Sequence, residues 1–167
     1  MGKGSVLLQK EVLFRQVHHW MTRKVLTISK KENLLHAAKK MAKYNVSCLV
    51  VEEHNKPLGI ITERDFLKKV VLDQKEPHNY LVQDVMTKYV RFLPEDADLI
   101  SAFELMKKYH IRRFPVVNRN GQLTGIITQR DILKGMVEIV RHLDWKLVRT
   151  RITFSEFQNH LEDVDVV

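Results

Sequence analysis

The chain repeats one pattern twice, and this repeat restricts the possible folds more than any other feature of its 167 residues. The segment Gly-Ile-Ile-Thr-x-Arg-Asp at residues 59–65 recurs at residues 125–131, and the pair Met21-Thr22 recurs as Met86-Thr87. The offset grows from 65 to 66 residues between these matches, because the second copy carries one extra residue in a polar turn. Insertions are tolerated best in turns, so the sequence predicts two copies of one small structural unit.

Each copy predicts the same succession of strand, helix, two hairpin strands and closing helix, which is an α/β (α+β) fold in two tandem β-α-β-β-α repeats. In the first copy we expect these elements at residues 25–28, 32–44, 47–52, 58–62 and 63–72. In the second copy we expect strands at 90–93, 112–118 and 122–128, a helix opened by the acidic segment 94–98, and a closing helix at 129–147. Ser29 and Glu32 form a capping-box pattern that predicts the start of the first helix.

The same reading divides the chain into four parts separated by changes in composition. We expect an N-terminal helical extension at 1–16, the first repeat at 17–73, the second repeat at 80–140 and a C-terminal helical tail at 141–167. The polar, proline-containing segment 73–79 is typical of a linker. A helix at 5–20 and a short helix beginning at Ser155 would flank the repeats. About 60 residues bury little apolar surface alone, so the two repeats should share a core.

Composition limits the class of protein. The apolar fraction of 44% and the charged fraction of 29% are those of a soluble globular protein. No apolar run approaches the length of a membrane span, no signal peptide is recognisable, and a single cysteine excludes an internal disulfide framework. These features favour a cytoplasmic location. The net charge of +8 favours an anionic partner without choosing among a nucleotide, a nucleic acid and a protein surface.

Four side chains, two in each copy, stand at the starts of the closing helices and are candidates for ligand binding. Thr62 and Asp65, and their counterparts Thr128 and Asp131, stand where a strand passes into a helix. A helix N-terminus suits phosphate, and a carboxylate there can accept both hydroxyl hydrogens of a ribose. The alternative is purely structural, because Thr-x-x-Asp is also a capping box. Both roles stay open, since a cap can be shared with a ligand.

Arginines form the second group of candidates. Arg112 and Arg113 enter a strand with apolar neighbours and could meet phosphate oxygens, or could be solvated arginines on an edge strand. Their first-copy counterparts, Ser47 and Cys48, carry no charge. Arg64 and Arg130 precede the two aspartates and could pair either with phosphate or with acidic neighbours.

The Met-Thr starts, the Gly-h-h-Thr-x-x-Asp signature (h is apolar) and the strand Ile-Arg-Arg-Phe-Pro-Val-Val resemble tandem CBS domains, a pair often called a Bateman module. The resemblance covers about residues 17–140. It implies repeats related by a pseudo-two-fold axis, commonly dimerising into a disc of four repeats, with AMP, ADP, ATP or S-adenosylmethionine in the clefts between repeats. It further implies ribose on Asp65 and Asp131, ribose or phosphate near Thr62 and Thr128, and phosphate on Arg112 and Arg113.

By the same resemblance, backbone groups near Val25–Thr27 and Val90–Phe92 would recognise the adenine edge, with Val25, Thr27, Val90 and Phe92 as candidates. Two sites are then possible, with unequal affinity. The cleft containing Asp65 would face Arg112, Arg113 and Arg130 and favour the more highly charged ligand.

Catalysis finds little support in the sequence. Its eight histidines are scattered without metal-ligand spacing, and no nucleophile elbow or phosphate-binding lysine loop occurs. We therefore expect that the protein is not an enzyme and needs no cofactor or metal. The resemblance further implies a regulatory sensor that forms a homodimer and acts on a separate protein. One alternative is a nucleic-acid-binding protein that uses the basic, aromatic segment 141–151 and a basic surface that includes Lys68, Lys69, Lys107 and Lys108. The other is an oligomerisation module without a ligand.

Overall fold

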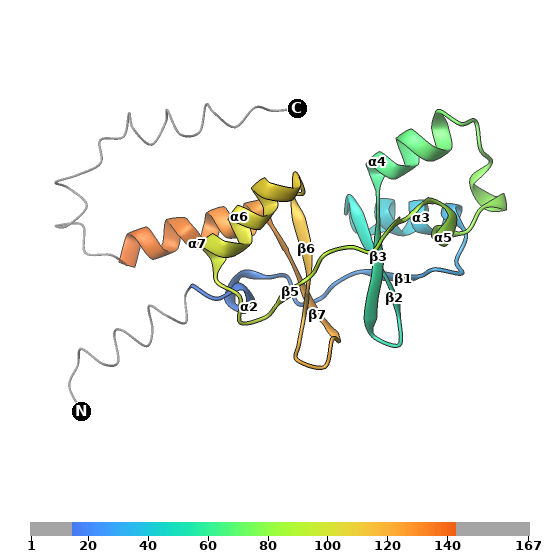
Figure 1. The fold of residues 1–167 in the computed structure, drawn as a ribbon. Coiled ribbons are helices and arrows are strands. Elements are labelled where there is room, and N and C mark those ends of the chain that lie inside the picture. Colours follow the sequence, from blue (N-terminus) through green and yellow to red (C-terminus); the bar gives the residue numbers. More distant parts are fainter. Residues whose placement is uncertain (1–14, 143–167) are drawn as a thin grey trace, which may run out of the picture.

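The computed structural model describes residues 15–142, which form two similar α/β units side by side (Figure 1). The first unit contains β1 (Thr27–Ser29), α3 (Leu34–Tyr44), β2 (Cys48–Glu53), β3 (Lys56–Thr62), α4 (Glu63–Phe66) and the π-helical turn η1 (Leu67–Val71). The second unit contains β5 (Leu93–Pro94), α6 (Leu99–Tyr109), β6 (Arg113–Val117), β7 (Leu123–Thr128) and α7 (Gln129–His142). This order of elements confirms the predicted β-α-β-β-α unit and its duplication.

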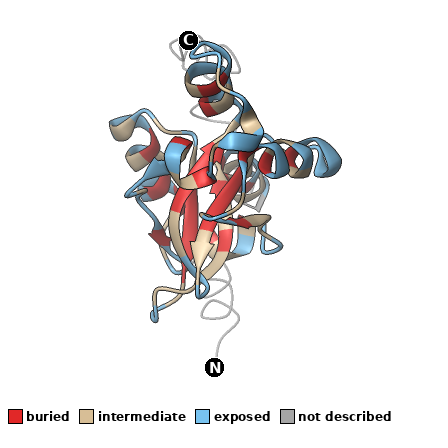
Figure 2. Cartoon of the chain, turned by 90° about the vertical axis from the view of Figure 1, so that its right-hand side faces the viewer, coloured by how far each residue is buried: buried red, intermediate tan, exposed pale blue. Residues whose placement is uncertain are grey.

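Each unit is built on one mixed sheet. In the first, β1 runs parallel to β2, and β2 and β3 form an antiparallel hairpin. In the second, β5 runs parallel to β6, and β6 and β7 form the equivalent hairpin. Both hairpins carry an irregularity at the same place, Val51/Glu52 and Val116/Val117. Buried residues concentrate on the strands, while the helices keep their outer faces exposed (Figure 2).

The two units exchange their first segments. Between the units lie η2 (Pro77–Asn79), α5 (Val82–Val85) and β4 (Thr87–Lys88), and ahead of the first lies α2 (Val17–Trp20). Strand β4 pairs with β3 and so becomes the fourth strand of the first sheet. Thr22 in turn forms a bridge with Ile126 of the second sheet. A repeat in the sequence is therefore not identical with a unit in space.

This exchange changes the predicted shared core. The apolar interior forms two clusters, one for each sheet. Val17 and Met21 belong to the cluster of the second unit, whereas Val82 and Val85 belong to that of the first. The expectation of one shared core is therefore wrong: each sheet has its own cluster, and each cluster is completed by residues from the leading segment of the other copy.

Several predicted boundaries are wrong in detail. The strands predicted at 25–28 and 90–93 begin later, at Thr27 and Leu93. The helix predicted from residue 32 begins at Leu34, where Asn33 is the N-cap and Ser29 is not. The physical reason is that Glu32 and Leu34 form backbone hydrogen bonds with the segment before α5, which keeps residues 32–33 out of the helix.

The flanking helices lie mostly outside the described residues. Of the helix predicted at 5–20 only α2 is described, and the helix predicted from Ser155 lies wholly outside the described range. Asp98, in the acidic segment predicted to open the helix of the second copy, is the N-cap of α6, where its carboxylate accepts hydrogen bonds from Ile100 and Ser101.

Candidate functional site

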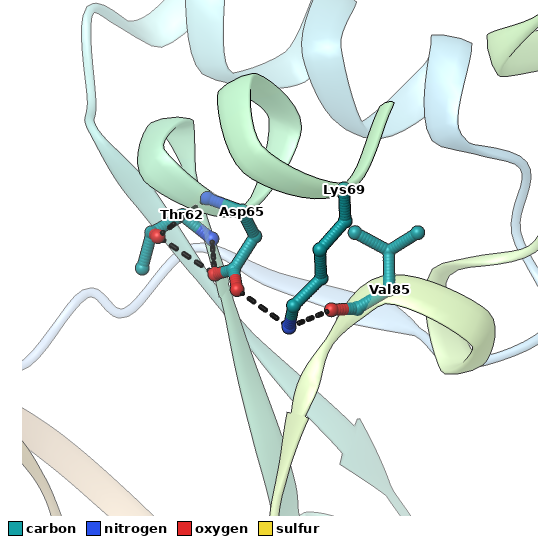
Figure 3. Close-up of polar contacts among 4 residues, drawn as sticks. All are labelled: Thr62, Asp65, Lys69 and Val85. Carbon is teal, nitrogen blue, oxygen red and sulfur yellow. Dashed lines mark hydrogen bonds and ion pairs between the residues drawn. The ribbon is translucent and has the colours of Figure 1, made fainter. Parts of the chain in front are cut away.

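The repeated spacing Thr-x-x-Asp forms a capping box at the end of β3. Thr62 Oγ1 accepts a hydrogen bond from the backbone N–H of Asp65 at 3.3 Å. Asp65 Oδ2 accepts from the backbone N–H of Thr62 at 3.0 Å and from Thr62 Oγ1 at 2.7 Å (Figure 3). The structural reading of this motif is thus confirmed, and the cap places a nearly buried carboxylate at the strand-to-helix turn.

A lysine occupies the other oxygen of this carboxylate. Lys69 Nζ lies 2.9 Å from Asp65 Oδ1, and it also donates to the backbone carbonyl oxygen of Val85 at 2.7 Å (Figure 3). Lys69 lies one helical turn after Asp65, a spacing at which side chains on a helix meet. Val85 ends α5 in the exchanged segment, so the lysine connects the capping box to that segment.

The second copy forms the same capping box without the lysine. Asp131 Oδ2 accepts from the backbone N–H of Thr128 at 2.9 Å and from Thr128 Oγ1 at 2.6 Å. The position equivalent to Lys69 is Gly135, and a Cβ there would lie 3.0 Å from the indole ring of Trp20. Among the described residues no hydrogen bond or ion pair reaches Asp131 Oδ1.

The structure brings the starts of β2 and β6 together across the two units. Arg113 Nη1 donates to Ser47 Oγ at 3.2 Å. The carbonyl oxygens of Ser47 and Arg112 accept from Glu63 and Gln129, the first residues of α4 and α7. The candidate arginines and the two capping boxes therefore lie at the same end of the sheets.

For Arg64 and Arg130 the structural alternative was pairing with acidic neighbours. For Arg112 and Arg113 it was solvation on an edge strand, and β6 is instead the middle strand of its sheet. Arg64, Arg112 and Arg130 are exposed and Arg113 is half-buried. No salt bridge between any of these four and a carboxylate occurs within residues 15–142. Their guanidinium groups remain available to an anion.

The predicted adenine edge differs between the copies. In the first copy Thr27 is engaged: its Oγ1 donates to Glu52 at 3.0 Å, and its carbonyl oxygen accepts from Lys40 Nζ at 2.7 Å. In the second copy Phe92 lines a cavity of about 290 Å³ together with Arg91, Leu93, Leu105, Tyr109 and Phe114. Leu105 stands where the first copy has Lys40, and the guanidinium of Arg91 lies 3.8 Å from the centre of the Tyr109 ring. Val25 and Val90 are half-buried just ahead of β1 and β5.

A larger cavity, of about 380 Å³, lies away from both capping boxes. It is lined by His18, Arg23, Pro94, Glu95, Asp96, Val117, Asn118 and Arg119. In the part of the chain that the structure describes, no cluster of three or more His, Cys, Asp or Glu side chains is placed to hold a metal ion. Nor is any described helix long and apolar enough to cross a membrane.

Sequence reasoning missed Lys69 and Lys40, the two lysines that occupy candidate acceptors in the first copy only. The spacing Asp65 to Lys69 was a usable signal, because oppositely charged residues four apart on a helix form pairs. Lys40 gave no such signal, since its acceptor is a backbone carbonyl 13 residues earlier.

Comparison with known proteins gives one family. The CBS domain family model matches residues 15–72 and 82–138. A protein of Methanopyrus kandleri with no known function is 41% identical over 113 residues, which are 67% of this chain and 58% of that one. The inosine-5'-monophosphate dehydrogenase of Methanocaldococcus jannaschii is 40% identical over 111 residues, and there the match covers only 21% of the relative. The chain thus spans little more than half the length of one of these relatives and a fifth of the other.

Solved structures agree in fold. A signal-transduction protein with CBS domains from Burkholderia ambifaria is 28% identical with a TM-score of 0.64, covering 79% of this chain and 89% of that one. A CBS domain pair in complex with 5'-methylthioadenosine and S-adenosyl-L-methionine is 28% identical with a TM-score of 0.65, covering 74% of this chain and 96% of that one.

Proposed function

The chain belongs to the CBS domain family, and from that premise we propose that it binds an adenine nucleotide or an adenosyl ligand between its two repeats. The ligand would be AMP, ADP, ATP or S-adenosylmethionine. The observation that carries the proposal is the duplicated Thr-x-x-Asp cap, held at the same end of the sheets as four arginines without acidic partners among residues 15–142. The similar CBS domain pair that holds S-adenosyl-L-methionine supports an adenosyl ligand.

Each group in the proposed site has one task. A carboxylate of Asp65 or Asp131 accepts the ribose hydroxyls, because it can take more than one donor at a time. The hydroxyls of Thr62 and Thr128 lie within hydrogen-bonding distance of these carboxylates and complete the polar edge. Arg113 and its neighbour Arg112 meet phosphate oxygens by charge-assisted hydrogen bonds.

The base would lie against Val25–Thr27 in one cleft and Val90–Phe92 in the other. The cavity beside Phe92 supports the second of these, because its aromatic and apolar lining suits a flat base. In the first copy the carbonyl of Thr27 already binds Lys40, so the two base sites would differ. That the cleft of Asp65 takes the more highly charged ligand stays a prediction.

The proposed activity is regulation without catalysis. A ligand phosphate between the units would neutralise Arg112 and Arg113 and draw the repeats together. A ligand shifts such an equilibrium only by its differential affinity for the two arrangements, and a partner protein would read the outcome. No cofactor is required for this role.

A homodimer is part of the proposal and is supported by matching apolar side chains on the closing helices. Leu67 and Val71 of η1 are 57% and 62% exposed. Leu133 and Val137, at the equivalent positions of α7, are 49% and 43% exposed. Apolar faces repeated on both units suit a two-fold contact with a second copy. Light scattering on the purified chain should give twice the monomer mass, and Leu67→Glu with Leu133→Glu should halve it.

A thermal-shift panel tests the ligand proposal. Any of the four ligands at 100 times its Kd should stabilise the fold by about 2.7 kcal/mol. The double variant Asp65→Ala/Asp131→Ala should keep a cooperative transition and lose that shift. The exposed Asp96 provides the control, since Asp96→Ala removes the same charge away from the caps.

No shift with any adenosine ligand at high micromolar concentration would reject the sensor function. Oligonucleotide binding that falls steeply with salt and survives the double variant would establish the nucleic-acid alternative instead. That alternative rested on the net charge of +8, on basic residues such as Lys107 and Lys108, and on residues 141–151, and nearly all of this last segment lies outside the described range.

A further inference from the structure

The two candidate ribose carboxylates differ in what their second oxygen binds. In each copy Oδ2 belongs to the capping box. Asp65 Oδ1 carries Lys69, whereas no group within residues 15–142 bonds Asp131 Oδ1. In that range every fully buried side-chain oxygen has a hydrogen-bond partner. Asp131 is half-buried and its Oδ1 has no partner, so this oxygen must be accessible to solvent.

The Lys69 side chain is 43% exposed, and its amine is bonded at two points. Its amine has two acceptors on different elements, Asp65 Oδ1 at 2.9 Å and the Val85 carbonyl at 2.7 Å. The Asp65 side chain is 12% exposed, so water screens the pair less than it would at the surface. A ligand hydroxyl that approaches Asp65 Oδ1 must therefore compete with an ammonium group.

In the second unit the corresponding place is crowded by the side chains of Leu99 and Trp20. A Cβ on Gly135 would lie 2.6 Å from Leu99 Cδ1 and 3.0 Å from the Trp20 ring. Trp20 is the repeat equivalent of Val85, so the indole fills the space that the lysine stem crosses in the first unit. The clefts thus differ at two neighbouring positions: Lys69 is replaced by Gly135, and Val85 corresponds to Trp20.

We propose that Lys69 is an internal cation that occupies the ribose acceptor of the first cleft, so that the cleft of Asp131 binds the adenosine ligand first. This inference rests on the proposed function. Only Asp131 has a free carboxylate oxygen for the ribose hydroxyls. The cleft of Asp65 accepts them only when Lys69 leaves the carboxylate, and we expect at least about tenfold weaker binding there. An ion pair between an ammonium group and a carboxylate must then be exchanged for hydrogen bonds in which only the carboxylate is charged.

Calorimetric titration of the full chain with AMP, and in parallel with S-adenosylmethionine, tests this. The unaltered chain should bind about one equivalent with its higher affinity. Asp131→Ala should remove that site, while Asp65→Ala should leave it. Lys69→Met removes the amine and keeps most of the stem, and it should raise the stoichiometry to about two.

Two further variants make the test specific. Lys68→Met makes the same change of charge one residue earlier, at an exposed side chain, and should leave one site. Adding Asp65→Ala to Lys69→Met should return the stoichiometry to one, because the new site would use Asp65. A variant that merely loosened the fold would not create a site that this second substitution removes.

The inference is overturned if the unaltered chain binds two equivalents with equal affinity, or if Asp65→Ala abolishes its single site. It is also overturned if Lys69→Met weakens binding, because the amine would then contact the ligand. Absence of heat with both ligands in every variant, together with no thermal shift with ADP or ATP, would reject the proposed function itself and is distinguishable from these outcomes.

Discussion

Gly59 marks the closest approach between the exchanged strand and the first sheet. It lies in β3 opposite Lys88 of β4. A Cβ added there would lie 2.6 Å from the carbonyl oxygen of Thr87 and 3.1 Å from the sulfur of Met86. The oxygen belongs to backbone that is paired with Ile60, so it cannot turn aside. Gly59→Ala should therefore push β4 away from the sheet.

The expected destabilisation is about 2 kcal/mol. Overpacking a closely packed position costs about 1–3 kcal/mol, and a weakened backbone hydrogen bond adds about 1 kcal/mol. Against this, alanine reduces the entropy of the unfolded chain and returns about 0.4–1 kcal/mol. For a protein of this size, 2 kcal/mol corresponds to a fall of roughly 4–8 °C in melting temperature.

The matched control is Gly125→Ala, at the equivalent position of β7. There the new Cβ would meet the sulfur, Cγ and Cε of Met21, which belong to one flexible side chain. Methionine readily adopts other rotamers, so this substitution should cost less than about 1 kcal/mol. Urea denaturation of both variants without ligand, followed by circular dichroism, measures the difference. Equal stability of Gly59→Ala and the unaltered chain, or a larger loss for Gly125→Ala, would refute the reasoning.

Three further predictions concern caps and titrating groups. Asn33→Ala and Asp98→Ala remove the N-caps of α3 and α6 and should each lower the free energy of unfolding by about 1 kcal/mol in urea titrations. A hydrogen bond from Lys30 lowers the pKa of Glu53 below its usual 4.5. The stability that this bond contributes is therefore present above pH 4.5 and is lost as the pH falls through the lower pKa of the folded state. Glu53→Gln should flatten that part of the pH–stability profile. Desolvation, with smaller contributions from nearby cations, lowers the pKa of His19 below 6.5, so stability should decrease as the pH falls below 6.5, and His19→Gln should reduce that slope.

Local features were predictable from the sequence, because they depend on residues close together along the chain. The capping boxes at Thr62 and Thr128 span four residues, and the hairpins follow from alternating apolar residues on either side of a turn. The start of α3 was not predictable, although Ser29 and Asn33 are both good caps. The choice between them was made by backbone hydrogen bonds to residues 80 and 82, which local sequence does not contain.

The exchange of segments could not be read from the repeat at all. An alignment of the copies establishes that Val17 corresponds to Val82, but it does not say against which sheet either one packs. The inequality of the two sites was predictable in part. The change from Arg112 to Ser47 is visible in the sequence, whereas the occupation of Asp65 depends on the position of the Val85 carbonyl, which only the fold supplies.

The exchange also determines how a ligand could be sensed. Strand β4 pairs with Gly59 and Ile60, which lie three and two residues before the cap at Thr62. It continues along the chain into the segment that ends at Phe92. The cap and β4 are thus connected through strand β3, and β4 leads along the chain to the proposed base site. Because Lys69 bonds both the cap and the residue that precedes β4 by two positions, releasing it from Asp65 would loosen that connection at the point where the units are joined. A ligand that competes for Asp65 would therefore act on this connection through Lys69, in addition to any effect of its phosphates on Arg112 and Arg113.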